Sequence, residues 1–74
     1  MAKVNCKSAF GHRLRHLRET RGMTQEGLAQ AAGLDRSYLG SVERGERNIS
    51  LENICKLAAS LKVRTANLMD IDDG

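Results

Sequence analysis

The chain contains no proline and no tryptophan, and Phe10 and Tyr38 are its only aromatic residues. The absence of proline leaves helices uninterrupted, because proline removes a backbone donor and breaks a helix interior. A β-rich fold would contain more aromatic and β-branched residues than this chain does. The apolar residues are mainly leucine and alanine, with a few isoleucines and valines, which favours helices. We therefore expect an all-α protein.

Long apolar runs are also missing. No stretch approaches the ~20 residues that cross a bilayer, and the N-terminus lacks the apolar segment of a signal peptide. The sequence therefore predicts a cytoplasmic protein with no membrane partner, in which Cys6 and Cys55 are free thiols rather than a disulfide. A length of 74 residues corresponds to one domain, residues 1–74. Such a domain has a small hydrophobic core, and dimerisation could add to the area that it buries.

Motifs for enzymatic chemistry are absent as well. The sequence has no glycine-rich phosphate loop, no nucleophile elbow and no metal-binding motif. His12 and His16 are four residues apart, so that with Cys6 and Cys55 a zinc site is conceivable, but their spacing matches no tight Cys/His pattern. We therefore expect no metal, no cofactor and no enzymatic activity.

The charge that is present is distributed unevenly. The formal net charge is +3, with a balance of +4 over residues 1–47 and of −1 over residues 48–74. A basic N-terminal part and an acidic C-terminus are typical of a domain that turns one face toward a polyanion. Many proteins of this charge bind nothing anionic, so the distribution is only suggestive without a motif.

The spacing of apolar residues predicts five short helices in a compact bundle. The first is expected from about Ser8 to Arg21, and Gly22 supplies the left-handed turn that ends it. Its apolar stripe consists of Phe10, Leu14 and Leu17.

Two helices of about eight residues are expected next. The second is predicted to begin after Thr24 as N-cap and to break at Gly33. The third is predicted to follow Asp35 as N-cap, to cover about Arg36 to Arg44 and to stop at Gly45.

The remaining two helices follow Ser50 and Thr65, which we expect as N-caps. The fourth is predicted to carry on one face Leu51, Ile54, Leu57, Ala58 and Leu61. Leu68 belongs to the short fifth helix. Cys55 lies beside the stripe of the fourth helix and is expected in the core or at a dimer surface. Cys6 is expected in a frayed N-terminus.

The most informative stretch is TQEGLAQAAGLDRSYLGSVERG, residues 24–45, which reads as two short helices joined by a tight turn. Ala29 and Ala32 are small residues where the two helices must cross closely. Such a pair can place its second helix in the major groove of DNA while the first crosses the backbone.

The third helix makes chemical sense as a reading element. If Leu39 and Val42 face inward, its exposed residues are Arg36, Ser37, Gly40, Ser41 and Arg44. Arg36, at the N-terminal tip, can donate two hydrogen bonds to O6 and N7 of guanine. Tyr38 could contact a sugar, a thymine methyl or a phosphate, or pack half-buried against the second helix. Surface serines and solvated charges are the alternative for the other positions.

Candidate phosphate contacts flank this helix. Gln25 is expected at the first position of the second helix, beside free backbone N–H groups and the positive end of the dipole. Arg44, Arg47 and Asn48 follow the third helix and could hold the strand, or could belong to a solvated end and loop. Phosphate contacts fix register without reading sequence directly.

The segment FGHRLRHLRETRGMTQEGLAQAAGLDRSYLGSVERGERNISLENICKLAASL, residues 10–61, resembles the lambda-repressor-like (XRE/Cro) helix-turn-helix family. Within that family, LDRSYLGSVERGERNISL looks most like the small controller proteins of restriction–modification systems. The resemblance implies a helix-turn-helix core at about residues 10–64. It also implies a homodimer that binds DNA upstream of its own gene, in the bacterial cytosol or nucleoid, and times endonuclease expression.

The resemblance also implies roles for individual residues. Groove-reading residues would be Arg36, Ser37 and Ser41. Further contacts would come from Tyr38, Arg47 and Asn48, and contacts to phosphates from Gln25 and Arg44. Arg18 and Glu43 match a pair that forms an internal ion pair between the first and third helices. The partners would be a pseudo-palindromic operator, a second copy through helices four and five, and RNA polymerase touched by the bound dimer.

Two other interpretations remain open from the sequence. A phage-type repressor or the antitoxin of a toxin–antitoxin pair would have the same motif. A helical interaction module that does not bind DNA would keep the apolar stripes but would not need Arg36, Arg44 and Arg47.

Overall fold

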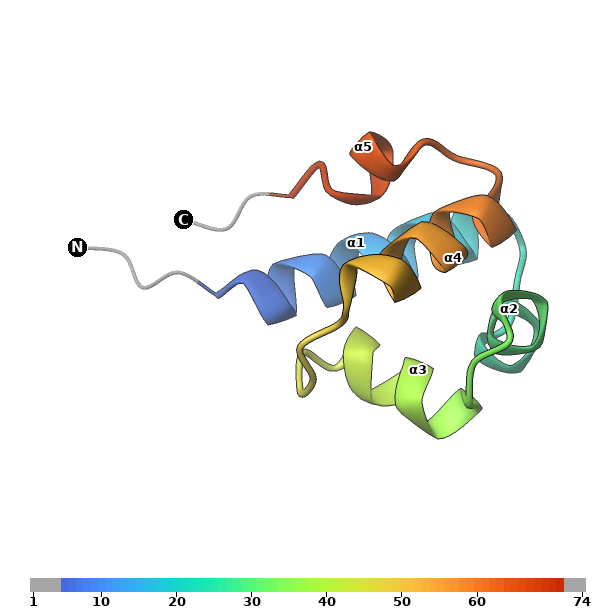
Figure 1. Cartoon of the computed structure of the whole chain (residues 1–74), viewed down its shortest axis with the longest axis horizontal. Coiled ribbons are helices and arrows are strands. Elements are labelled where there is room, and N and C mark those ends of the chain that lie inside the picture. Colours follow the sequence, from blue (N-terminus) through green and yellow to red (C-terminus); the bar gives the residue numbers. More distant parts are fainter. Residues whose placement is uncertain (1–4, 72–74) are drawn as a thin grey trace.

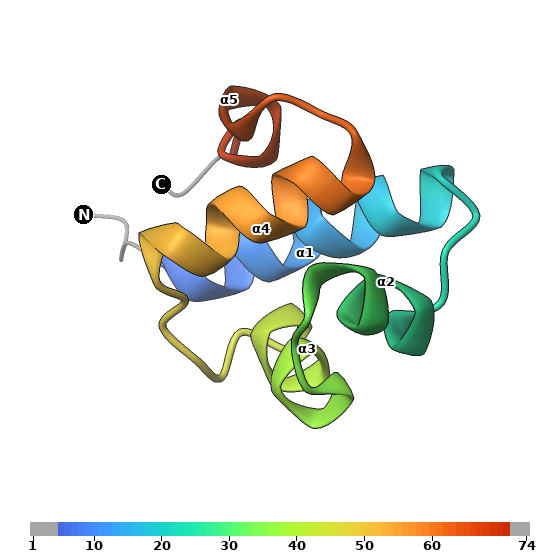
Figure 2. The same ribbon diagram turned by 45° about the vertical axis from the view of Figure 1, so that its right-hand side comes forward.

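The computed structural model describes residues 5–71, and helices are the only regular elements in that range. They are α1 (Cys6–Thr20), α2 (Gln25–Ala32), α3 (Arg36–Glu43), α4 (Leu51–Leu61) and α5 (Thr65–Leu68). In both views α5 lies on one side of α1 and α4, and α2 and α3 lie on the other side (Figures 1 and 2). The expected all-α bundle of five short helices is confirmed.

The helix boundaries follow from local capping. The Thr24 hydroxyl accepts a hydrogen bond from the backbone N–H of Gly27 at 3.0 Å, and the Ser50 hydroxyl accepts one from Asn53 at 3.1 Å, as N-caps do. Gly22 and Gly33 have φ values of 68° and 69°, a left-handed conformation that costs glycine little. These predicted start and stop signals are confirmed.

Two boundary predictions were wrong. The first helix begins at Cys6 rather than Ser8, because the side chain of Asn5 accepts from the backbone N–H of Ser8 and caps the helix earlier. Cys6 is therefore helical rather than frayed. Asp35 occupies the N-cap position of α3 as predicted, although its side chain makes no capping hydrogen bond. Thr65 lies inside α5, whose N-cap position is taken by Arg64.

The core is formed by apolar side chains from all five helices. Its fully buried large members are Leu14, Leu28, Leu39, Val42, Leu57, Leu61 and Leu68. Leu51 does not belong to it, since 73% of its surface is exposed. The apolar stripe of α4 extends past the core at this first residue of the helix. Cys55 is also exposed, so it is not a core residue.

Two contacts of α1 position its neighbours. Gly11 is buried, and a Cβ at that position would lie 2.5 Å from the carbonyl oxygen of Glu43, so α1 and the end of α3 meet backbone to backbone. The Arg13 guanidinium donates to the carbonyl oxygen of Asn67 at 2.8 Å and ties α5 to α1. None of the described helices is both long enough and apolar enough to cross a membrane.

Candidate nucleic-acid interface

The α2–turn–α3 unit has the geometry expected of its sequence. Gly33 reverses the chain after α2, and the backbone N–H of Leu34 donates to the carbonyl oxygen of Ala29 at 2.8 Å, which closes the helix end. Leu28 and Ala29 from α2 and Leu39 and Val42 from α3 are buried in the shared core. The exposed side of α3 is thereby fixed relative to α2.

Five of the candidate contact residues are exposed. Arg36 and Ser37 form the first turn of α3 and face solvent, as the sequence predicted. Arg44, at the other end of the helix, and Arg47 and Asn48, in the loop that follows, are exposed too. The structure therefore places one accessible cationic side chain at the N-terminal tip of α3 and two near its C-terminal end.

Ser41, which the sequence predicted at the surface of α3, is buried. It is only 8% exposed, and its hydroxyl donates to the carbonyl oxygen of Tyr38 at 2.7 Å. Gly40, expected at the surface as well, is also buried. The expectation was wrong because the whole final turn of α3 is enclosed by neighbouring elements, so that the residues between its two core positions are covered as well.

Tyr38 is partly buried and already has partners. Its hydroxyl accepts a hydrogen bond from the side-chain amide of Asn53 at 3.2 Å, and the Arg47 guanidinium lies 5.7 Å from the ring centroid, within the range of a cation–π contact. The ring thus links α3 to α4 and to the loop that follows α3. Asn53 was missed in the sequence, because nothing in its local pattern points to a partner fifteen residues away.

The structure joins the first three helices through a buried polar cluster. The Arg18 guanidinium donates to both carboxylate oxygens of Glu43, from Nε to Oε2 at 2.7 Å and from Nη2 to Oε1 at 3.1 Å. Its Nη1 donates to the carbonyl oxygen of Met23 at 2.8 Å, and Gln25 Nε2 donates to Glu43 Oε1 at 3.0 Å. The hydrogen bond to Glu43 raises the pKa of Arg18, so the guanidinium stays charged although it is buried.

This cluster changes the view of Gln25. Its side chain is partly buried and turned toward Glu43, so a phosphate at the start of α2 would meet the free backbone N–H groups of the first turn before the amide. Among residues 5–71, every buried side-chain polar atom has a hydrogen-bond partner. The arrangement that orients α3 is therefore complete without a ligand.

Two acidic residues near α3 were also missed as candidates. Asp35 is exposed beside Arg36, and its side chain makes no capping hydrogen bond to α3. Its carboxylate could therefore accept a hydrogen bond from the N4 amine of a cytosine. Glu46 accepts a hydrogen bond from Arg44 Nε at 3.0 Å, which raises the pKa of Arg44. Acidic side chains are unexpected on a surface that binds DNA. A search of the sequence for basic residues therefore does not select them.

Comparisons with known proteins identify the fold. Residues 14–68 match the helix-turn-helix family HTH_3. Control protein C.BamHI from Bacillus amyloliquefaciens is 40% identical over 67 residues, which cover 89% of this chain and 83% of that protein. The crystal structure of the restriction–modification controller protein C.AhdI from Aeromonas hydrophila is 56% identical, covers 82% of this chain and 92% of its own, and has a TM-score of 0.81. The regulator SinR, solved in complex with DNA, is 35% identical over 82% of this chain and 98% of its own, with a TM-score of 0.78.

Proposed function

Because this chain belongs to the helix-turn-helix family HTH_3, we propose that this DNA-binding transcriptional regulator is the controller protein of a restriction–modification system. It acts as a homodimer on an operator upstream of its own gene, in the bacterial cytosol or nucleoid, without enzymatic activity. The observation that carries the proposal is the exposed tip of α3, on a helix whose orientation the Arg18–Glu43 pair fixes.

Sequence reading would come from this tip. With α3 in the major groove, Arg36 donates to O6 and N7 of a guanine, and Ser37 bonds a neighbouring base or phosphate. Tyr38 retains a hydroxyl proton to donate, because Asn53 occupies its oxygen as a donor. Arg44, Arg47, Asn48 and the first turn of α2 hold phosphates and set the register.

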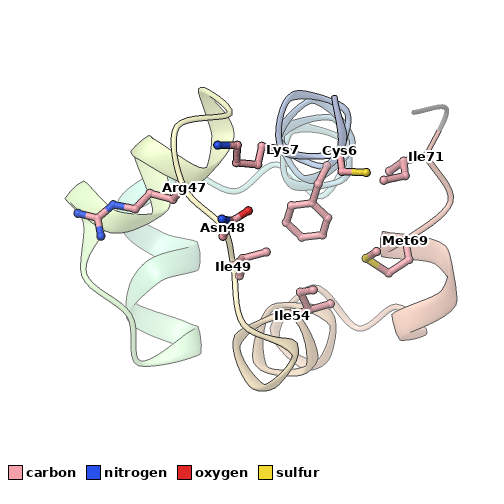
Figure 3. A pocket seen from close by; sticks show the side chains of 9 residues that line it. Cys6, Lys7, Arg47, Asn48, Ile49, Ile54, Met69 and Ile71 are labelled. Atoms are coloured by element: carbon pink, nitrogen blue, oxygen red, sulfur yellow. The ribbon is translucent and has the colours of Figure 1, made fainter. Parts of the chain in front are cut away.

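The dimer would form through α4 and α5. Leu51 and Met69 are the exposed large apolar side chains among the described residues, at the start of α4 and just after α5. Met69 also lines a cleft of about 400 Å³, whose other apolar walls are Phe10, Ile49, Ile54 and Ile71 (Figure 3). A second copy that covers this surface would place two α3 helices on half-sites about 34 Å apart, on a pseudo-palindromic operator. A dimer bound there could touch RNA polymerase.

We expect tight and selective binding to DNA from upstream of the gene. A fluorescence-anisotropy titration at one physiological salt concentration should show cooperative binding, with a preference of roughly 10³-fold or more over a scrambled duplex. Affinity should fall steeply as salt rises, because counterions are released from the phosphates. Equal and weak binding to both duplexes would instead favour a helical interaction module, and a toxin gene or phage genes beside the coding sequence would argue against the controller role.

Removing the side chain of Arg36 is expected to relax specificity. Arg36→Ala should weaken operator binding by about 1–3 kcal/mol and abolish the preference at one base pair, since a bidentate contact to guanine is lost. Arg15→Ala is the matched control, because it removes the same formal charge of +1 from an exposed residue of α1 that lies outside the proposed contacts. If both variants lose the same affinity on operator and on scrambled DNA, Arg36 does not read a base.

A further inference from the structure

Glu46 stands at a fixed position beside the proposed DNA contacts. It is the only carboxylate in the segment from 44 to 50. Gly45, at φ 77°, donates its backbone N–H to the carbonyl oxygen of Val42, and Glu46 donates its own to Ser41, both at 3.0 Å. These two bonds form a Schellman motif, which holds the backbone of Glu46 against the last turn of α3. The carboxylate therefore projects from a defined point.

The side chain of Glu46 engages the cation nearest to it. Its Oε2 lies 3.0 Å from Arg44 Nε, and the two side chains are 57% and 60% exposed. Arg44 folds back along α3, because its Nη1 lies 3.2 Å from the position that a Cβ on Gly40 would take, and Gln25 Oε1 lies 3.5 Å from the same point. The positive charge of Arg44, at the C-terminal end of α3, is thus balanced by the negative charge of Glu46.

We propose that Glu46 weakens the binding of this chain to DNA of every sequence, and thereby raises the protein concentration at which the operator fills. A phosphate that approaches Arg44 meets a guanidinium already paired with a carboxylate, and it is repelled by that carboxylate. Phosphates carry no sequence information, so the effect falls on operator and random DNA alike. The inference rests on the function proposed above, in which operator affinity sets the concentration at which expression of the chain's own gene changes.

The test replaces the carboxylate by an amide of the same shape. Glu46→Gln keeps an acceptor for Arg44 but removes the negative charge. Binding to both the upstream duplex and the scrambled duplex should tighten by about 1.5- to 5-fold, the range of an exposed charge interaction. The slope of log affinity against log salt should steepen by about one unit, since Arg44 can then neutralise a phosphate. Stopped-flow measurements should place most of the gain in the association rate.

Glu19→Gln is the matched control. Glu19 accepts from Arg15 Nε at 3.2 Å, the two side chains are 54% and 63% exposed, and the substitution makes the same change in net charge on α1. This variant should leave both affinities close to those of the unmodified protein.

Each other outcome has a definite meaning. Unchanged or weaker binding by Glu46→Gln overturns the inference, and weaker binding would mean that Glu46 orients Arg44 for DNA. An equal gain in Glu19→Gln overturns it too, because net charge alone would then explain the effect. If the unmodified chain fails to prefer the upstream duplex, the proposed function is wrong. The comparison of the two variants on scrambled DNA still decides the role of Glu46.

Discussion

Replacing Glu43 by alanine is expected to lower the free energy of unfolding by about 3–5 kcal/mol, the usual cost of breaking a buried ion pair by removing one partner. The substitution leaves the Arg18 guanidinium charged and buried, with only the carbonyl oxygen of Met23 as an acceptor. It also removes the acceptor of Gln25, so that α1, α2 and α3 lose their common polar contact. Because native proteins are stable by about 5–15 kcal/mol, this loss removes a large fraction of the total stability.

The measurement is urea unfolding followed by circular dichroism, at one fixed protein concentration because dimerisation adds stability. A double variant, Arg18→Met with Glu43→Met, separates the buried charge from the lost packing. Apolar replacement of both partners is often neutral, so the double variant should recover to within about 2 kcal/mol of the unmodified protein. A double variant as unstable as Glu43→Ala, or a single variant that loses less than about 1 kcal/mol, would mean that the charge is not the cause.

Local chemistry made most of the fold predictable from the sequence. Thr24 and Ser50 cap their helices through bonds that span three residues, and Gly22 and Gly33 end theirs through backbone conformations that glycine adopts most easily. Such signals are contained within one turn of chain. Both ends of α2 and the start of α4 are therefore correct to within one residue, and the helix-turn-helix arrangement follows from them.

The candidate site was less predictable, because its details depend on contacts between distant residues. Ser41 was expected at the surface because only its own helix was considered, whereas burial there depends on the elements that enclose the last turn of α3. The bond between Asn53 and Tyr38 joins residues fifteen apart, and the pair of Arg18 and Glu43 joins residues twenty-five apart. The second of these pairs was expected only from the family resemblance, since no local pattern indicates it.

Gly11 shows how packing can reverse the sign of a prediction from sequence. In a helix interior, alanine is favoured over glycine by about 1 kcal/mol, so Gly11→Ala should stabilise α1 on propensity alone. In the structure, a Cβ at Gly11 would lie 2.5 Å from the carbonyl oxygen of Glu43 and 2.6 Å from that of Val42. Real Cβ atoms do not approach other atoms so closely, and both carbonyls belong to the backbone of α3. The two helices must move apart, and such overpacking costs about 1–3 kcal/mol or more.

We therefore expect Gly11→Ala to destabilise the protein by up to about 2 kcal/mol in urea unfolding, which is the overpacking cost less the gain in helix propensity. Gly40→Ala is the matched control, because Gly40 is also helical and buried. A Cβ there meets the flexible tip of Arg44 at 3.2 Å, which can shift, so this variant should be neutral or more stable. A shift of α1 against α3 should also displace the Arg18–Glu43 pair and the tip of α3, so Gly11→Ala should lose operator affinity at protein concentrations where it remains folded. If Gly11→Ala is as stable as Gly40→Ala, the close approach of α1 to the end of α3 is not a constraint on the fold.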